Sequence, residues 1–276
     1  MVLVAPASAN VIGKIANGIA DDMLTTTVMA CPCKKIISPA MNHNMYHNPI
    51  VQDNLEKLAR FGYEIIPPET GMLANGDSGD GRMPDERLLL EYILKEIACE
   101  KDLAGKKVLV TAGATREAID PVRFITNHST GKMGYALAEA AMLRGAEVTL
   151  ISGPTAIEPP MFVNVIPIIS AQEMFEKVAT NATENDIIIK AAAVADYRPK
   201  EVCDEKIKKS DHDTEIELER TTDILAYLGK NKGKTFLCGF SMETENMLEN
   251  SRRKLDKKNL DMIVANNLKD KGAGFG

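Results

Sequence analysis

The stretch that decides the fold is residues 107–154, KVLVTAGATREAIDPVRFITNHSTGKMGYALAEAAMLRGAEVTLISGP. It begins with an apolar, β-rich run at 108–111 and continues through a glycine-containing loop. A helix then begins near Lys132, ends at Gly145, and is followed by a second apolar run at 148–152. This order of strand, helix and strand predicts a βαβ unit.

The loop of this unit is longer than its connection requires. About twenty residues separate the strand from the helix, and long loops in compact units are usually functional or disordered. The loop ends as STGKMG, and the unpaired amide groups at a helix start favour an anion. Ser129, Thr130 and Gly131 therefore indicate a phosphate or carboxylate site, with an ordinary capped helix after a long loop as the alternative.

Two common nucleotide-binding motifs are not found in this stretch. A Walker loop needs Ser or Thr after its lysine, and here Met133 follows Lys132. A dinucleotide-binding unit carries G-x-G-x-x-G after its first strand and often an acid after its second, which here ends in Ser152 and Gly153. The sequence therefore disfavours an NAD(P) oxidoreductase.

Length and composition restrict the class of protein. A chain of 276 residues is long enough for two domains, and we expect a first domain at 1–100, a linker at 101–106 and a second domain at 107–276. The net charge of -6 and the pI near 5.4 argue against a general nucleic-acid binder. Since no apolar run approaches about 18 residues and no signal sequence is evident, we expect a cytoplasmic protein without a membrane partner.

Strands alternate with helices in both halves, which predicts an α/β fold with mainly parallel sheets. In the first half we expect strands at 2–5, 35–38 and 63–66, each followed by a helix. The segment 71–83, GMLANGDSGDGRM, is too rich in glycine for a strand or a helix and indicates a mobile flap over a ligand. In the second half we expect further strands at 186–189, 215–219, 235–240 and 262–265, and a long helix at 245–258.

Ligands of such sheets lie beyond the carboxyl ends of the strands, so the loops there should converge on one crevice. Asp196 is the only acid in the loop after the strand at 186–189 and would suit Mg²⁺, with Lys206 and Lys254 as charges for phosphates. The alternative is that both lysines belong to solvated surface.

Several longer motifs resemble one family. VTAGATREAIDPVRFITNHSTGKMG, AAVADYRP, EKIKK and KNLDMIVANN are similar to the phosphopantothenate-cysteine ligase half of the bifunctional coenzyme A biosynthesis flavoproteins. LVAPASANVIGKIANGIADDML, PAMNHNMY and GMLANGDSGDGRMP are similar to the phosphopantothenoylcysteine decarboxylase half. The resemblance covers essentially the whole chain. It implies a partial flavodoxin-like flavoprotein domain followed by a Rossmann-like, mainly parallel α/β ligase domain.

For the second half, the resemblance implies a two-step ligation. CTP would react with the carboxylate of 4'-phosphopantothenate to give an acyl cytidylate, and the amine of cysteine would then displace CMP. By motif position, Asn127 handles the acyl cytidylate together with 129–131, Lys206 is needed to form it, and Asp196 contacts Mg²⁺ and the nucleotide. The other residues that the resemblance assigns to the CTP site are Ala192, Ala193, Phe240, Lys254 and Lys258.

For the first half, the resemblance implies an FMN-dependent decarboxylase in which Asn10 and Asn42 hold the substrate carboxylate, with Met45 beside it. The family also assembles as homo-oligomers. Asn75 stands where the family has a cysteine that donates a proton, and an amide cannot replace it. The family's catalytic histidine lies upstream of PASAN, and its last strands lie beyond 276. We therefore expect a chain truncated at both ends with an inactive decarboxylase module; the alternative is a non-catalytic regulatory or partner-binding member of the family.

Overall fold

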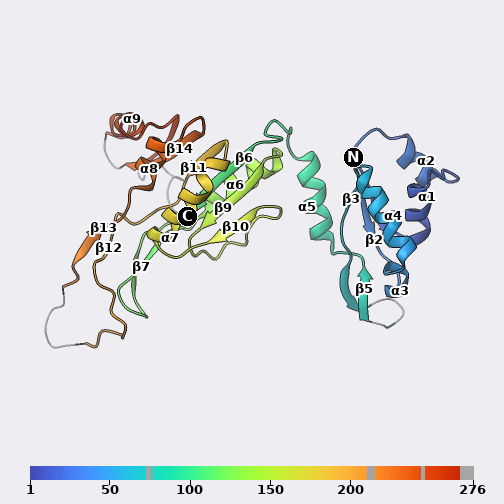
Figure 1. Ribbon diagram of the computed structural model, residues 1–276, viewed down its shortest axis with the longest axis horizontal. Helices are drawn as coiled ribbons and strands as arrows, with labels where there is room; N and C mark the ends of the chain where they lie inside the picture. The colour runs from blue at the N-terminus through green and yellow to red at the C-terminus, as the bar shows by residue number, and fades with distance from the viewer. Residues whose placement is uncertain (73–75, 77, 210–214, 244–245, 268–276) are drawn as a thin grey trace. The chain divides into compact units, whose positions relative to one another are not determined.

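The computed structural model describes residues 1–72, 76, 78–209, 215–243 and 246–267. The chain divides into two compact units, Met1–Cys99 and Glu100–Gly276, each with its own core. Figure 1 shows both units, with labels on most of their helices and strands. Each unit is described by itself below.

The first unit is built on a parallel sheet of β1 (Val2–Ala7), β2 (Lys35–Pro39) and β3 (Glu64–Ile65). Successive residues of a strand face opposite sides, so Ile37 packs with α1 (Ala9–Ala16) and α4 (Pro49–Arg60), while Ile36 packs with α5 (Glu86–Ile97). Side-chain caps begin these helices: Ser8, Asn48 and Asp85 accept from backbone amides of α1, α4 and α5. The remaining helices are α2 (Met23–Ala30) and α3 (His43–Tyr46).

The second unit contains a six-stranded, wholly parallel sheet in the order β10-β9-β6-β11-β14-β15. Its strands are β6 (Lys107–Ala112), β9 (Glu147–Ser152), β10 (Asn164–Pro167), β11 (Ile187–Lys190), β14 (Phe236–Glu243) and β15 (Met262–Asn267). The predicted βαβ unit is confirmed as β6, α6 (Lys132–Leu143) and β9, with β6 and β9 paired in parallel.

Helices cover both faces of this sheet, so its central strands are apolar on both sides. Val108 and Val110 pack against α6, whereas Leu109 and Ile188 pack against α7 (Ala171–Asn181) and α8 (Ile224–Asn231). Helix α9 (Met247–Lys257) contacts β14 and β15. The contact between α6 and β6 is so close that a Cβ atom on Gly134 would lie 2.5 Å from the Ala112 Cβ.

Two segments expected to be loops contain short hairpins, and the expectation that 71–83 holds no strand is wrong. In the segment 71–83, β4 (Glu69–Met72) pairs antiparallel with β5 (Ser78–Arg82). The glycine at 81 has φ +132° and approaches the Met41 carbonyl oxygen too closely for a side chain, so glycine here permits a strand contact rather than preventing one. In the loop after β6, β7 (Arg116–Ala118) pairs antiparallel with β8 (Phe124–Thr126).

Other element boundaries differ from the expectations. The strand expected at 215–219 is β13 (Leu218–Arg220), which pairs with β12 (Tyr197–Pro199) in a two-stranded sheet outside the six-stranded one (Figure 1). Residues 210–214, 244 and 245 lie outside the described part of the chain. Within the described residues, no helix combines the length and the apolar character needed to span a bilayer.

Candidate functional site

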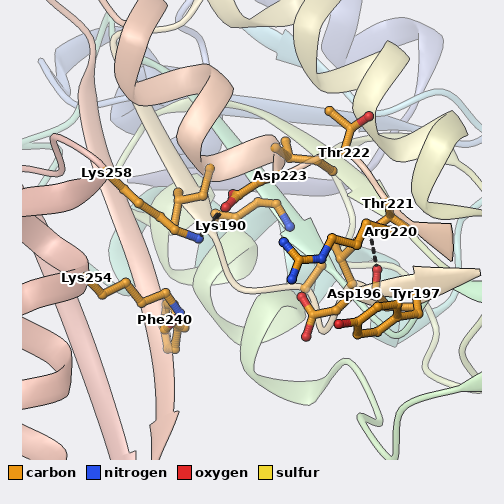
Figure 2. Close-up of a pocket in the computed structure, with 15 residues that line it drawn as sticks. Lys190, Asp196, Tyr197, Arg220, Thr221, Thr222, Asp223, Phe240, Lys254 and Lys258 are labelled. Carbon is orange, nitrogen blue, oxygen red and sulfur yellow. Dashed lines mark hydrogen bonds and ion pairs between the residues drawn. The ribbon is translucent and has the colours of Figure 1, made fainter.

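A pocket of about 410 Å³ lies in the second unit at the carboxyl end of β11. Because the sheet is parallel, segments from different parts of the chain meet at this edge. Residues that follow β11 form one wall, the segment from β13 into α8 forms a second, and β14 with α9 completes the pocket (Figure 2). The predicted residues that line it are Ala192, Asp196, Phe240, Lys254 and Lys258.

The pocket carries an excess of positive charge. Four cationic side chains line it, from Lys190, Arg220, Lys254 and Lys258, against the two carboxylates of Asp196 and Asp223. Two of the cations are held in place, since Lys258 Nζ pairs with Asp223 Oδ2 at 2.9 Å and Lys254 Nζ donates to the Phe240 carbonyl oxygen at 2.8 Å. Such a site attracts a polyanion such as a nucleotide polyphosphate.

Asp223 connects this pocket to the start of α8. Its Oδ1 accepts from the Ala226 amide at 2.9 Å, which caps the helix. Burial alone would raise the pKa of Asp223, but the hydrogen bonds from Lys258 and from the Ala226 amide outweigh burial and lower it. The carboxylate is therefore charged at neutral pH and fixes Lys258 toward the pocket.

Asn127 lies beside the strand edge rather than in the pocket lining. Its Nδ2 donates to the Ala193 carbonyl oxygen at 3.2 Å. The Ala193 amide in turn donates to the Gly113 carbonyl oxygen at 2.9 Å, so both backbone groups of Ala193 are used within the protein. Ala193 does not line the pocket, which leaves Ala192 as the predicted alanine that does.

Lys206 is exposed and also lies outside the pocket lining. Its neighbour Ile207 is tied to the loop after β6, because the Ile207 amide donates to Asp120 Oδ2 at 3.1 Å and its carbonyl oxygen accepts from Arg123. The Cys203 amide also donates to the Ile119 carbonyl oxygen. Segment 203–207 is therefore fixed against the same loop that carries Asn127.

Asp120 is the centre of this attachment. It is buried, and it accepts hydrogen bonds from Arg123 and from the Val122 and Ile207 amides. The bond from the Arg123 guanidinium is the largest of the effects that hold the pKa of Asp120 far below its usual range. The predicted long loop is thus an ordered structure built around one carboxylate.

The predicted anion site at 129–131 is partly occupied by local hydrogen bonds. The Gly131 amide donates to Ser129 Oγ at 3.4 Å and the Lys132 amide to Thr130 Oγ1 at 3.5 Å. Gly131 is left-handed with φ +87°, and it begins α6 without a side-chain cap.

In the first unit, Asn10 and Asn42 follow the ends of neighbouring strands. Asn10 is exposed in the first turn of α1, after β1, and half-buried Asn42 precedes α3, after β2. Asn42 Oδ1 accepts from the Asn44 amide at 2.9 Å, so its Nδ2 is the group that can donate to a ligand. Met45 is 48% exposed on α3.

A polar cluster begins directly after Asn42 in the chain, at His43. His47 Nε2 is 2.9 Å from Asp80 Oδ2, His43 Nδ1 accepts from the Asp80 amide at 3.2 Å, and Thr70 Oγ1 donates to Asp80 Oδ1. One nitrogen or oxygen of each of His43, His47 and Asp80 lies within 4.8 Å of the others, a spacing that a metal ion could draw together. Asn75, the departure from the family cysteine, lies outside the described residues.

Sequence reasoning missed several residues of the pocket. Lys190, Arg220 and Asp223 line it, but none belongs to a motif that had been assigned to ligand binding. Lys190 could have been noticed, because it is a charged residue at the end of the apolar run Ile187–Lys190 and directly before the AAAVAD loop. Arg220 and Asp223 approach the pocket through β13 and α8, whose placement only the fold reveals.

Comparisons with known proteins cover both units. Residues 103–276 match the family model described as DNA/pantothenate metabolism flavoprotein C-terminal domain, and residues 1–98 match the one described as Flavoprotein. Coenzyme A biosynthesis bifunctional protein CoaBC of Bacillus subtilis is 52% identical over 279 residues, covering 100% of this chain and 69% of that protein. A cysteine/cysteine sulfinic acid decarboxylase from an unknown prokaryotic organism is 49% identical over 280 residues, covering 99% of this chain and 78% of that protein.

A solved structure is also similar to this chain. The crystal structure of the C-terminal domain of coenzyme A biosynthesis bifunctional protein CoaBC is 54% identical, with a TM-score of 0.54. The similarity covers 59% of this chain and 78% of that one.

Proposed function

The chain belongs to the family of bifunctional coenzyme A biosynthesis proteins, and from this premise we propose that its second unit is a CTP-dependent phosphopantothenate-cysteine ligase. The single observation that carries this proposal is the cationic pocket at the carboxyl end of β11. It presents lysines and an arginine for phosphates, and Asp196 as a hard oxygen donor that fits Mg²⁺. The substrates are 4'-phosphopantothenate, CTP and cysteine.

The chemistry follows from the weakness of a carboxylate as an electrophile. A carboxylate oxygen of 4'-phosphopantothenate attacks the α-phosphorus of CTP and releases pyrophosphate, which converts that oxygen into part of a good leaving group. The amine of cysteine then attacks the acyl carbon and displaces CMP. Lys254, Lys258 and Arg220 stabilise the negative charge that develops on the phosphates, a role that fixed cations perform well.

Asn127 and Lys206 are assigned to the acyl cytidylate. Asn127 lies on the loop after β6, and the segment of Lys206 is joined to that loop through Asp120. Asn127 donates to the Ala193 carbonyl oxygen, three residues before Asp196. We assign Asn127 and the amides around 129–131 to holding the intermediate, and Lys206 to forming it. Because Lys206 is outside the pocket lining, this role requires its side chain to swing toward the nucleotide.

The first unit is proposed as the FMN-dependent phosphopantothenoylcysteine decarboxylase module. Asn10 and Asn42 present neutral amides, which can donate to a carboxylate without adding a positive charge that would oppose its loss. This donor set fits the substrate carboxylate and not the FMN phosphate. When bound, the flavin would supply the oxidation and reduction. With Asn75 in place of a cysteine, we expect substrate binding without efficient turnover. We also propose that the chain forms homo-oligomers.

A pyrophosphate-release assay tests the ligase. Pyrophosphate should be formed from CTP only when 4'-phosphopantothenate is present, and Lys206→Gln should abolish it. Lys208→Gln is the matched control, since it removes a charge from a nearby exposed lysine of the same segment and should leave the rate unchanged. Release of pyrophosphate without 4'-phosphopantothenate would contradict the proposal, and absence of CTP binding would favour a non-catalytic, partner-binding protein.

A further inference from the structure

Lys190 is a buried lysine that has no role in the reaction proposed above. It ends β11 and lines the pocket, yet only 8% of the residue is exposed. Among the described residues, the one hydrogen-bond partner of its Nζ is Met174 Sδ at 3.8 Å, and a thioether is a weak acceptor. Lysine is almost never buried this deeply unless it is paired, because burial of an uncompensated ammonium group is costly.

The groups around Lys190 do not balance its charge. Helix α7 offers the uncharged Met174, and the β14 residue in register with Lys190 is Gly239, which has no side chain. The carboxylate of Asp223, at the start of α8, is already paired with Lys258 of the α9 C-terminus. Figure 2 shows the Lys190 side chain reaching into the pocket among Asp223, Lys258 and Arg220.

The remaining charged groups of the pocket lie on the other segments that line it. Besides Lys258, two more positive charges line the pocket, on Lys254 of α9 and Arg220 of β13. The second carboxylate is that of Asp196, which follows β11. An ammonium at Lys190 therefore raises an existing excess of positive charge in the empty pocket. A bound polyanion would supply the missing negative charge and so stabilise the ammonium form of Lys190.

We propose that Lys190 is a further ligand-binding residue of this pocket, which takes up one proton from solvent as a nucleotide polyphosphate binds and then contacts a phosphate oxygen as an ammonium. The inference rests on the proposed function of the second unit and adds a specific coupling between nucleotide binding and pH. Burial is the main reason that the pKa of Lys190 is lowered to about 7; Asp223 acts in the opposite direction, and Lys254 and Lys258 add to the lowering. At pH 8, most Lys190 side chains in the empty pocket are then neutral.

Titration calorimetry with CTP and Mg²⁺ tests this coupling, using the full chain at pH 8 and pH 9. The phosphates of CTP are fully ionised at both values, since the last phosphate pKa is roughly 6. In buffers of different ionisation enthalpy, the wild type should take up nearly one proton per CTP bound, and its affinity should fall by up to about tenfold per pH unit. Lys190→Met should bind CTP more weakly, with no proton uptake and little pH dependence.

Controls separate this inference from its premise. Lys177→Met changes an exposed lysine of α7 outside the pocket and should behave as the wild type. Cytidine, which has no phosphates, should bind without proton uptake. Equal proton uptake by the wild type and Lys190→Met would overturn the role of Lys190 while leaving the proposed function intact; failure of the wild type to bind CTP at any pH would overturn both.

A ligand-free measurement guards against misfolding of the variant. Because the pKa of Lys190 is lowered in the folded protein, the unfolded chain binds more protons between about pH 7 and its usual pKa of about 10.4. The destabilisation by Lys190 is therefore largest at neutral pH and decreases as the pH rises. Lys190→Met should raise the melting temperature more at pH 7 than at pH 10; a lower melting temperature at both values would overturn the assignment of an uncompensated buried amine.

Discussion

The two units place opposite kinds of polar group at the carboxyl ends of their strands. The first unit offers the neutral amides of Asn10 and Asn42, whereas the second gathers three lysines and an arginine around a pocket of about 410 Å³. The difference matches the proposed chemistry of each unit. A substrate carboxylate that is to be lost must not be stabilised by a cation, but a polyphosphate needs cations both to bind and to react. The same edge of a parallel sheet, the carboxyl ends of its strands, is thus used for a different chemistry in each unit, and the loop residues at that edge make the difference.

The largest expected effect comes from removing a cation from the second unit. Lys258→Ala should lower CTP-dependent pyrophosphate release by about 100-fold, since a hydrogen bond to a charged group is worth roughly 1.5–3 kcal/mol. Lys257→Ala removes the neighbouring, exposed charge of α9 outside the pocket and should have little effect. Equal losses in the two variants would indicate a general charge effect rather than the pocket.

A matched pair of glycine substitutions tests how closely each unit is packed. Gly134→Ala would place a Cβ 2.5 Å from the Ala112 Cβ and 2.9 Å from the Thr111 carbonyl oxygen, and should destabilise the second unit by about 1–3 kcal/mol. Gly13→Ala in α1 meets nothing closer than 3.9 Å and should stabilise the first unit by about 0.5–1 kcal/mol. Hydrogen exchange read by mass spectrometry reports each unit separately; a stable Gly134→Ala variant would show that α6 can move away from β6.

A negative charge can be introduced at the first site by a single substitution of Asn42. Asn42→Asp should weaken the binding of 4'-phosphopantothenoylcysteine by about tenfold, because two carboxylates repel when they share a site. The decarboxylated product, which lacks the carboxylate, should bind as before. Similar losses for both ligands in calorimetric titrations would place the carboxylate elsewhere in the unit.

The smallest expected effect concerns the hairpin of β4 and β5. Hydrogen bonds from Thr70 and from His47 lower the pKa of Asp80. The carboxylate therefore adds stability above its ordinary pKa of about 3.9, and this contribution is lost as the pH falls through the lowered value. Asp80→Asn should increase amide exchange in 69–72 and 78–82 slightly at pH 7. An equal difference between wild type and variant at pH 2 would exclude the charge of Asp80 as its cause.

Sequence reasoning predicted what is encoded locally and missed what depends on contacts between distant segments. The βαβ unit followed from the apolar runs at 108–111 and 148–152 and from the helix signals at Lys132 and Gly145. Five pocket residues followed from their motifs. Both hairpins were missed because glycine-rich and polar stretches carry little strand signal, and their pairing depends on tertiary contacts such as that of Gly81 with Met41. Lys190 was missed for a related reason: its burial is a property of the assembled sheet.

Asp120 has a consequence for how this protein can be recombined. Its carboxylate joins 119–123 to the amide of Ile207, 87 residues further along the chain, and so couples the Asn127 loop to the segment of Lys206. A chimaera that takes only one of these two segments from a homologue would pair it with a segment from a different protein, so the hydrogen bonds around Asp120 could be lost. Libraries built by domain shuffling should therefore treat 112–131 and 203–207 as a single exchange block, although they lie far apart in the sequence.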